Sequence, residues 1–329
     1  MFGHDAMSDG QHIDRRYRKI INLVAGAGDQ GCWNEGIYLV QNRRSGVFAV
    51  QKILKSEDVA FGSAELEIRI LRDLRHRHVV TYVDAFLDTF SYTASLFTEY
   101  CDLGTLDELI ARFATHRRLI PEDFIWHVFT SLIEGLVYCH TGHTSSNMVS
   151  HYTHKPGWLT VLHRDLKAGN IFLQTCATSP FPQVKLGDFG MAIRADNPMF
   201  HDTAYAGAIT VMPPETPKFS EQGDVWGVGV NMQVMCRLDE GPLVPRPFHY
   251  DVRDWFHHPH AFQPRGAGHN YSPTLNAAVD LCQQMLRRDR PRALDLAIWM
   301  RGVTIDVKTR PLPSWALPLS GLYGPEYQY

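Results

Sequence analysis

Apolar residues follow two different periods along this chain. Up to about residue 100 they form short runs of strand length, with a single helix-like stretch over 63–74. Further on, they recur every three or four residues, most clearly over 121–140. The pattern predicts a small antiparallel β-sheet with one helix, followed by a larger, mainly helical part. The expected strands of the sheet are 20–24, 37–40, 47–53, 79–86 and 93–99.

A short polar loop between two buried strands carries the first candidate chemistry. Apolar residues flank it at 161–162 and 171–173, and between them stand Asp165, Lys167 and Asn170. Phosphoryl transfer needs a group that orients the attacking hydroxyl, a cation for the moving phosphate and a ligand for a metal ion. The carboxylate, the ammonium and the amide of this loop match those three requirements.

A glycine-rich stretch follows the first expected strand. Gly26, Gly28 and Gly31 fit the pattern G-x-G-x-x-G, which is also found in dinucleotide-binding enzymes. Those enzymes continue into a helix, whereas two further strands are expected here, which argues against that class of enzyme. A glycine loop between strands allows backbone N–H groups to approach phosphates closely, because no side chain stands in the way.

The polar loop resembles the catalytic loop of eukaryotic protein kinases. From His163 to Asn170 it reads His-Arg-Asp-Leu-Lys-Ala-Gly-Asn. Other kinase landmarks follow in order, including Asp-Phe-Gly at 188–190 and Pro-Pro-Glu at 213–215, where kinases usually have Ala-Pro-Glu. Lys167 is typical of serine/threonine kinases, and the surrounding motifs are most similar to the NIMA-related group.

The resemblance implies an α+β, two-lobed protein kinase-like fold. One lobe is expected to be a small antiparallel β-sheet with one key helix, and the other to be larger and mainly helical. The expected segments are a disordered N-terminal segment at 1–17, a small lobe at 18–100, a large lobe at 101–303 with an insertion at 142–159, and a C-terminal tail at 304–329.

The resemblance also implies a reaction, transfer of the ATP γ-phosphate to serine or threonine hydroxyls of protein substrates. Asp165 and Lys167 are the implied catalytic residues. Asn170 and Asp188 are the implied ligands of Mg²⁺ or Mn²⁺, which prefer oxygen donors. The implied ATP-binding residues are Gly26, Gly28, Gly31, Ile37, Ala49, Lys52, Glu67, Glu99, Cys101 and Leu173.

The third expected strand leaves the phosphate-binding lysine undecided. If Ala49 covers the adenine ring, the lysine is expected two residues later on the same face, and that position is Gln51. Lys52 then points to the opposite face unless the strand slips or carries a bulge. Either Lys52 is recruited to pair with Glu67, or the chain is a pseudokinase that acts as a binding or scaffold module. Ala208, where kinases commonly have threonine, favours the second alternative.

A possible switch lies between the Asp-Phe-Gly and Pro-Pro-Glu motifs. In kinases, an arginine at the position of Arg164 pairs with a phosphorylated residue of this segment. Thr203 is the first candidate for that phosphorylation and Tyr205 the second.

Charged residues in the helical part are expected to support the fold. Asp224 resembles the aspartate that accepts hydrogen bonds from the catalytic loop, and Arg290 the arginine that pairs with Glu215. Several histidines have no cysteine or acidic partner at zinc-ligand spacing and are interpreted as solvated loop residues. They are His140, His143, His151, His154, His257, His258 and His260.

Composition narrows the functional classes. Hydrophobic residues make up 44% of the 329 residues and charged residues 20%, as in soluble globular proteins. The net charge of -3 gives no sign of nucleic-acid binding beyond ATP, and no apolar run is long enough to span a bilayer, so no membrane partner is expected. The six scattered cysteines favour reduced thiols and a cytoplasmic or nuclear location.

Overall fold

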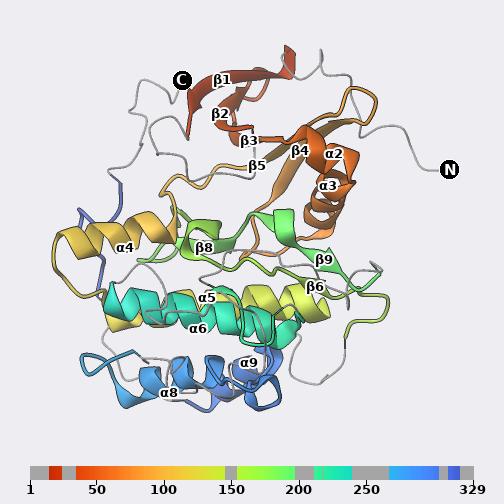
Figure 1. Cartoon of the computed structure of the whole chain (residues 1–329). Helices are drawn as coiled ribbons and strands as arrows, with labels where there is room; N and C mark the ends of the chain where they lie inside the picture. The colour runs from red at the N-terminus through yellow and green to blue at the C-terminus, as the bar shows by residue number, and fades with distance from the viewer. Residues whose placement is uncertain are drawn as a thin grey trace. The chain divides into compact units, whose positions relative to one another are not determined.

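The computed structural model of the chain describes residues 15–23, 35–144, 154–196, 211–216, 218–238, 267–303 and 310–318 (Figure 1). By the contacts within it, the chain divides into two compact units. The described part of unit 1 runs to Arg75 and resumes at Val79–Cys101, and the described part of unit 2 comprises His76–His78 and the residues from Asp102 onward. This two-lobed α+β organisation confirms the expected fold class.

Unit 1 is built on a five-stranded antiparallel sheet in the order β1-β2-β3-β5-β4. The central strand β3 pairs in regular register with β2 on one side and with β5 on the other. Alternate β3 residues therefore face opposite sides of the sheet. The strands are β1 (Tyr17–Asn22), β2 (Gly36–Asn42), β3 (Phe48–Leu54), β4 (Tyr82–Asp88) and β5 (Thr93–Glu99).

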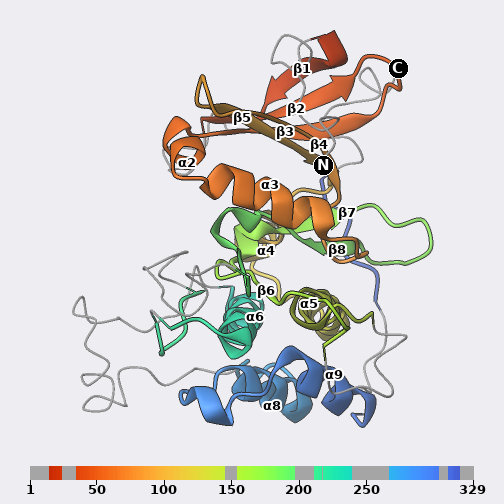
Figure 2. The same ribbon diagram turned by 90° about the vertical axis from the view of Figure 1, so that its right-hand side faces the viewer.

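Two helices lie on one face of this sheet (Figure 2). Helix α3 (Ser63–Asp73) has the expected position, and Ile68, Ile70 and Leu71 on its apolar side are buried. Helix α2 (Ser56–Ala60) was not expected, because five residues are too few for a helical period to emerge from the sequence.

Two strands differ from their expected bounds. β1 begins at Tyr17 rather than at residue 20, and the Tyr17 ring stacks on Phe97 with 4.4 Å between ring centroids. Tyr17 is therefore ordered although the N-terminal segment 1–17 was expected to be disordered, and residues 1–14 lie outside the described part. β4 begins at Tyr82 rather than at residue 79, and Val79 and Val80 are buried in the connection before it.

Most helices of unit 2 pack around α5 and α6, whereas α4 contacts β7 (Ile171–Gln174). In Figure 1 these two helices run side by side, α8 packs against α6, and α9 contacts both. Thr105 caps α4 as expected, since its side chain accepts a hydrogen bond from the Glu108 N–H. The helices are α4 (Leu106–Thr115), α5 (Glu122–Thr141), α6 (Glu221–Arg237), α8 (Pro273–Cys282) and α9 (Ala293–Arg301).

Two short antiparallel strand pairs flank the polar loop of unit 2. β6 (Val161–Leu162) pairs with β9 (Ile193–Arg194), and β7 (Ile171–Gln174) pairs with β8 (Gln183–Leu186). The two strands expected on either side of the loop are thus confirmed. Each end of the loop is fixed by backbone hydrogen bonds to a partner strand, which limits its freedom.

Part of the expected C-terminal tail packs onto unit 2. The ring of Trp315 stacks on His116 at 4.0 Å and meets Phe113 edge-on at 4.8 Å. Arg112 donates a hydrogen bond to the carbonyl oxygen of Ala316, which is fully buried. The segment 310–318 is therefore anchored on α4, a contact between distant parts of the sequence that its proline content did not indicate.

None of the helices in the described ranges is long and apolar enough to cross a membrane.

A half-buried histidine near the start of unit 2 makes stability depend on pH. His76 stacks on Tyr138, with ring centroids 4.9 Å apart. Burial, aided by the nearby His78, lowers the pKa of His76 from 6.5 to about 4. The unfolded chain therefore takes up this proton at a higher pH than the folded chain does. Acidification through that interval favours unfolding.

We expect the free energy of unfolding to fall as the pH drops from about 6.5 toward about 4, by up to about 3 kcal/mol from His76 alone. Urea unfolding measured at several pH values across this interval gives the slope. His76→Gln, which cannot take up the proton, is expected to flatten that slope. An unchanged slope in the variant contradicts the assignment to His76.

Candidate active site

The carboxylate of Asp165 is the centre of a compact polar group in unit 2. Lys167 Nζ lies 3.1 Å from one carboxylate oxygen of Asp165. Asn170 Nδ2 donates hydrogen bonds to the same carboxylate at 3.0 Å and to the carbonyl oxygen of Asp165 at 2.8 Å. The three side chains singled out in the sequence therefore meet, because a 3₁₀ turn over Ala168–Asn170 folds the loop back on itself.

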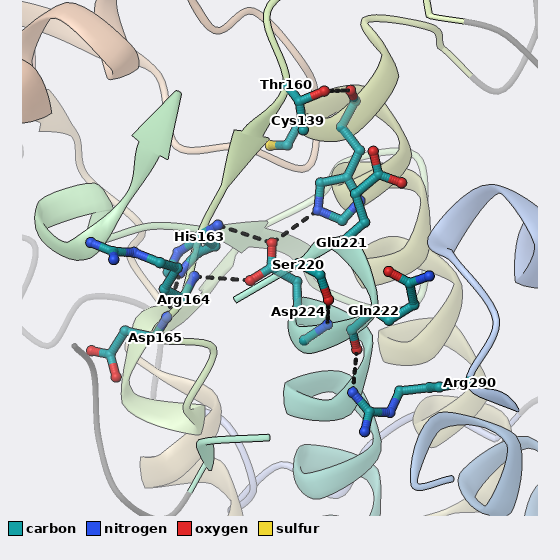
Figure 3. A network of polar contacts seen from close by, with 12 residues as sticks. Cys139, Thr160, His163, Arg164, Asp165, Ser220, Glu221, Gln222, Asp224 and Arg290 are labelled. Carbon is teal, nitrogen blue, oxygen red and sulfur yellow. Dashed lines mark hydrogen bonds and ion pairs between the residues drawn. The ribbon is translucent and has the colours of Figure 1, made fainter. Parts of the chain in front are cut away.

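Asp224 of α6 lies beside His163 and Arg164 and holds this part of the loop (Figure 3). Its carboxylate accepts hydrogen bonds from the backbone N–H groups of His163 and Arg164, both at 2.9 Å, as predicted. His140 Nε2 lies 2.9 Å from the same carboxylate. Burial alone raises the pKa of Asp224, but these hydrogen bonds and the nearby histidines outweigh it and hold the pKa below its usual value.

Arg164 precedes Asp165 and adopts a left-handed backbone conformation, with φ of 67°. Such a conformation costs a non-glycine residue about 1–2 kcal/mol and persists where neighbouring contacts enforce it. The guanidinium group donates to the Met191 carbonyl at 2.6 Å and lies over the Phe219 ring. Burial lowers the pKa of Arg164 to about 10, so the side chain stays positively charged at neutral pH.

His163 connects the loop to the Asp-Phe-Gly motif. Its Nε2 lies 2.9 Å from the Gly187 carbonyl oxygen, and its ring packs against Phe189. Gly187 also donates its N–H to the carbonyl oxygen of Asn170 at 2.9 Å. Asp188, the next residue, has an exposed side chain and a left-handed φ of 55°. The β7–β8 pair thus brings the backbones of the two expected metal-binding positions together.

In unit 1, the β3 side chain that meets α3 is Lys52 and not Gln51. Lys52 Nζ lies 2.9 Å from Glu67 Oε1, and both side chains are largely buried. Gln51 points to the other face of the sheet, where its Nε2 donates to Ser95 Oγ at 3.1 Å. Neither β3 pairing contains a register shift, so no bulge or slip is needed to bring Lys52 to Glu67.

The regular register also changes the interpretation of Ala49. Ala49 packs in a buried cluster with Tyr17, Val40 and Phe97, on the same face as Gln51. Val50, not Ala49, shares a face with Lys52, because only residues two apart in a strand point the same way. The geometry therefore favours Val50 over Ala49 for the position expected to cover the adenine ring.

The other expected ATP-binding residues that the structure describes lie in both units. Ile37 pairs directly with Lys52 across β2 and β3 and shares its face. Glu99 uses its side chain to accept the Thr81 N–H at 2.6 Å, and the neighbouring Cys101 is buried. In unit 2, Leu173 is buried, and its backbone bonds to residues 103 and 104. Gly26, Gly28 and Gly31 lie outside the described residues.

Comparison with known proteins identifies the family. The protein kinase domain matches residues 24–293, which is most of the chain. The chain belongs to the protein kinase family.

NIMA-related kinases are among the proteins to which this kinase domain is similar. Nek2 of Mus musculus, a serine/threonine-protein kinase, is 34% identical over 179 residues, covering 52% of this chain and 36% of the relative. The G2-specific protein kinase fin1 of Schizosaccharomyces pombe is 31% identical over 210 residues, 61% of this chain and 28% of its own length. The G2-specific protein kinase nimA of Emericella nidulans is 31% identical over 226 residues, which cover 64% of this chain and 32% of the relative. The chain therefore spans about a third of these relatives.

Two charged residues support the large lobe of this kinase domain from its interior. Arg290 Nη1 and Nη2 bond to the Glu215 carboxylate at 2.9 and 3.1 Å, which confirms the predicted ion pair. Arg290 also donates to the carbonyl oxygen of Gln222 at 2.9 Å in the first turn of α6 (Figure 3). The pair thus connects the Pro-Pro-Glu motif to the helix that carries Asp224.

His140 was wrongly interpreted as a solvated loop residue. It lies in α5, is 1% exposed and contacts Asp224. The sequence held a signal for this role, since His140 continues the apolar stripe of α5 three residues after Val137. His143 and His154 are partly or fully exposed, and the other histidines of the two groups lie outside the described residues.

Oxygen donors suited to a hard cation are present just before β7 and just after β8. Asn170 uses its amide nitrogen for Asp165, and these bonds leave its amide oxygen uninvolved. The exposed carboxylate of Asp188 is the second oxygen donor. An amide and a carboxylate suit Mg²⁺ or Mn²⁺ better than a soft metal. Across the described ranges, no group of three histidine, cysteine or acidic side chains is arranged to hold a metal ion.

Proposed function

We propose that this chain is an ATP- and Mg²⁺-dependent serine/threonine protein kinase. Its membership of the protein kinase family and the serine/threonine kinases among its relatives support this reaction. The observation that carries the proposal is the 2.9 Å contact between Lys52 and Glu67. Gln51 was the main argument for a pseudokinase, and the position of Lys52 beside Glu67 supports the catalytic alternative instead.

The chemistry follows from the side chains of each unit. In unit 2, Asp165 orients the substrate hydroxyl and accepts its proton, while the Lys167 ammonium stabilises the phosphate during transfer. Asn170 and Asp188 would hold Mg²⁺, and the bound cation would supply positive charge to offset that of the phosphates. In unit 1, Glu67 fixes the Lys52 ammonium for the nucleotide phosphates. The reaction is accelerated by positioning and electrostatics rather than by a covalent intermediate.

The substrates are proposed to be protein serine and threonine residues, because Lys167 follows Asp165 by two positions in the serine/threonine pattern. The proposed domain bounds, 18–303, enclose the family match at 24–293. Thr203 and Tyr205 stay candidate phosphosites. They and Ala208 lie outside the described residues.

Transfer of label from γ-labelled ATP to a generic protein substrate tests the proposal. We expect transfer with Mg²⁺, and its loss when EDTA removes the metal, because the phosphates then lose the cation that offsets their charge and face the Asp188 carboxylate directly. Asp188→Asn, which removes one anionic metal ligand, is expected to raise the Mg²⁺ concentration that gives half-maximal rate. Binding of ATP without transfer at any metal concentration supports the pseudokinase alternative instead.

A further inference from the structure

At Gly227, α6 approaches the catalytic loop too closely to accommodate a side chain. Asp224, Gly227 and Asn231 are spaced three and four residues apart along the helix and therefore share one face of it. A Cβ atom on Gly227 would lie 2.8 Å from the Cβ of Leu166 and 3.2 Å from its carbonyl oxygen. The loop thus rests on the helix at Leu166.

Asn231 makes a second polar contact at this point. Its Nδ2 donates one hydrogen bond to the Leu166 carbonyl oxygen and another to the Gly227 carbonyl oxygen, both at 2.8 Å. Both partners are acceptors, so the nitrogen rather than the oxygen of the amide must face them. The bond to Gly227, one turn earlier in the same helix, holds the side chain in the orientation that reaches Leu166. The amide is 2% exposed, so water does not compete for these bonds.

The two polar residues of this face have complementary roles. Asp224 accepts the N–H groups of His163 and Arg164, before the catalytic aspartate. Asn231 donates to the carbonyl group of Leu166, after it. The backbone of Asp165 is thereby held on both sides by one rigid helix.

A second buried amide side chain on α6 does not bond to the catalytic loop in this way but to the end of another helix. Gln233 is also 2% exposed, but its side-chain oxygen accepts a hydrogen bond from Gln283 Nε2 at 2.9 Å. That contact joins α6 to the end of α8. Gln233 therefore provides a matched control for the loss of a buried amide on the same helix.

We infer that Asn231 is a positioning residue for phosphoryl transfer. It fixes the peptide group between Leu166 and Lys167, and so sets the placement of the Asp165 carboxylate and the Lys167 ammonium relative to each other. The inference rests on the proposed kinase activity. Asn231 touches no reacting atom itself and acts through the loop backbone.

Three variants separate positioning from stability. Asn231→Leu removes both donated hydrogen bonds at similar volume. Asn231→Ser retains a hydroxyl that can bond to Gly227 one turn earlier but is too short to reach Leu166. Gln233→Leu removes a buried amide away from the loop. We expect both Asn231 variants to lower kcat by about 10-fold or more, with KM for ATP changed by less than about two-fold. Gln233→Leu is expected to lower the urea midpoint with kcat nearly unchanged.

Amide hydrogen exchange of the loop gives a readout that needs no activity. The Lys167 N–H bonds to the Asp165 carbonyl at 3.0 Å, and the Asn170 N–H to the Lys167 carbonyl at 2.9 Å. We expect faster exchange of these amides in Asn231→Ser and not in Gln233→Leu. Unchanged kcat and unchanged loop exchange in Asn231→Ser overturn the inference. If the wild-type chain transfers no phosphate, the proposed function fails, and the exchange comparison still decides whether Asn231 anchors the loop.

Discussion

Asp165→Asn is expected to lower kcat for phosphate transfer by about 10²- to 10⁴-fold, the range lost when a positioned general base is removed. Asparagine has nearly the same size as aspartate but cannot accept the hydroxyl proton. The substitution also removes the negative charge that lies 3.1 Å from Lys167 Nζ. The loop itself is expected to keep its conformation, because Asp224 still holds its backbone.

The measurement is the initial rate of label transfer, with ATP affinity determined in parallel. We expect ATP affinity to stay within about two-fold of the wild type, since Asp165 is assigned to the substrate hydroxyl and not to the nucleotide. Transfer at the wild-type rate by Asp165→Asn contradicts the assignment of Asp165 as the base. A joint loss of transfer and of cooperative unfolding points to a structural role instead.

The second large effect is expected at Lys52. Lys52→Met retains most of the aliphatic stem but removes the ammonium beside Glu67, and we expect kcat/KM for ATP to fall by about 10²-fold or more. The same change leaves the Glu67 carboxylate largely buried without this cation, so some loss of stability is expected as well.

Gln51→Met is the matched control on the neighbouring residue. It removes the hydrogen bond to Ser95 on the opposite face, so we expect the free energy of unfolding to fall by about 1–2 kcal/mol with little change in kcat/KM. Steady-state kinetics and urea unfolding on both variants give the comparison. Loss of activity in Gln51→Met alone, with Lys52→Met active, refutes the role given to Lys52.

The catalytic loop could be predicted from the sequence because its signal is local. Asp165, Lys167 and Asn170 lie within six residues, and the apolar residues on either side fix where the flanking strands begin and end. The predicted contacts of Asp224 and Arg290 span longer separations. They were available only through resemblance to a family, since no periodicity links such distant positions.

The register of β3 shows where single-strand reasoning fails. Alternation along the strand was applied correctly, and Lys52 does lie on the face opposite to Ala49. Ala49 was the reference chosen for the nucleotide face, whereas the geometry favours Val50. Which face meets α3 depends on the pairing of β3 with β2 and β5 and on the packing of the helix, and these are properties of the folded unit.

Two further features depended on contacts that the local pattern does not encode. Trp315 lies in a proline-containing segment, yet it is anchored by His116 and Phe113, about 200 positions earlier in the chain. Asn231 stands among apolar residues of α6, and the sequence alone does not show what it contacts. Its partner at Leu166 becomes evident only once the loop and α6 are in place.

The most direct test of the account is the identity of the residue that receives the phosphate. Wild-type protein is incubated with γ-labelled ATP, Mg²⁺ and a generic protein substrate, and the labelled amino acids of the product are then separated. The account predicts label on serine and threonine, and its absence when Asp165→Asn replaces the wild type. Wild-type protein that binds ATP and Mg²⁺ but leaves the substrate unlabelled, or that places the label on tyrosine alone, contradicts it.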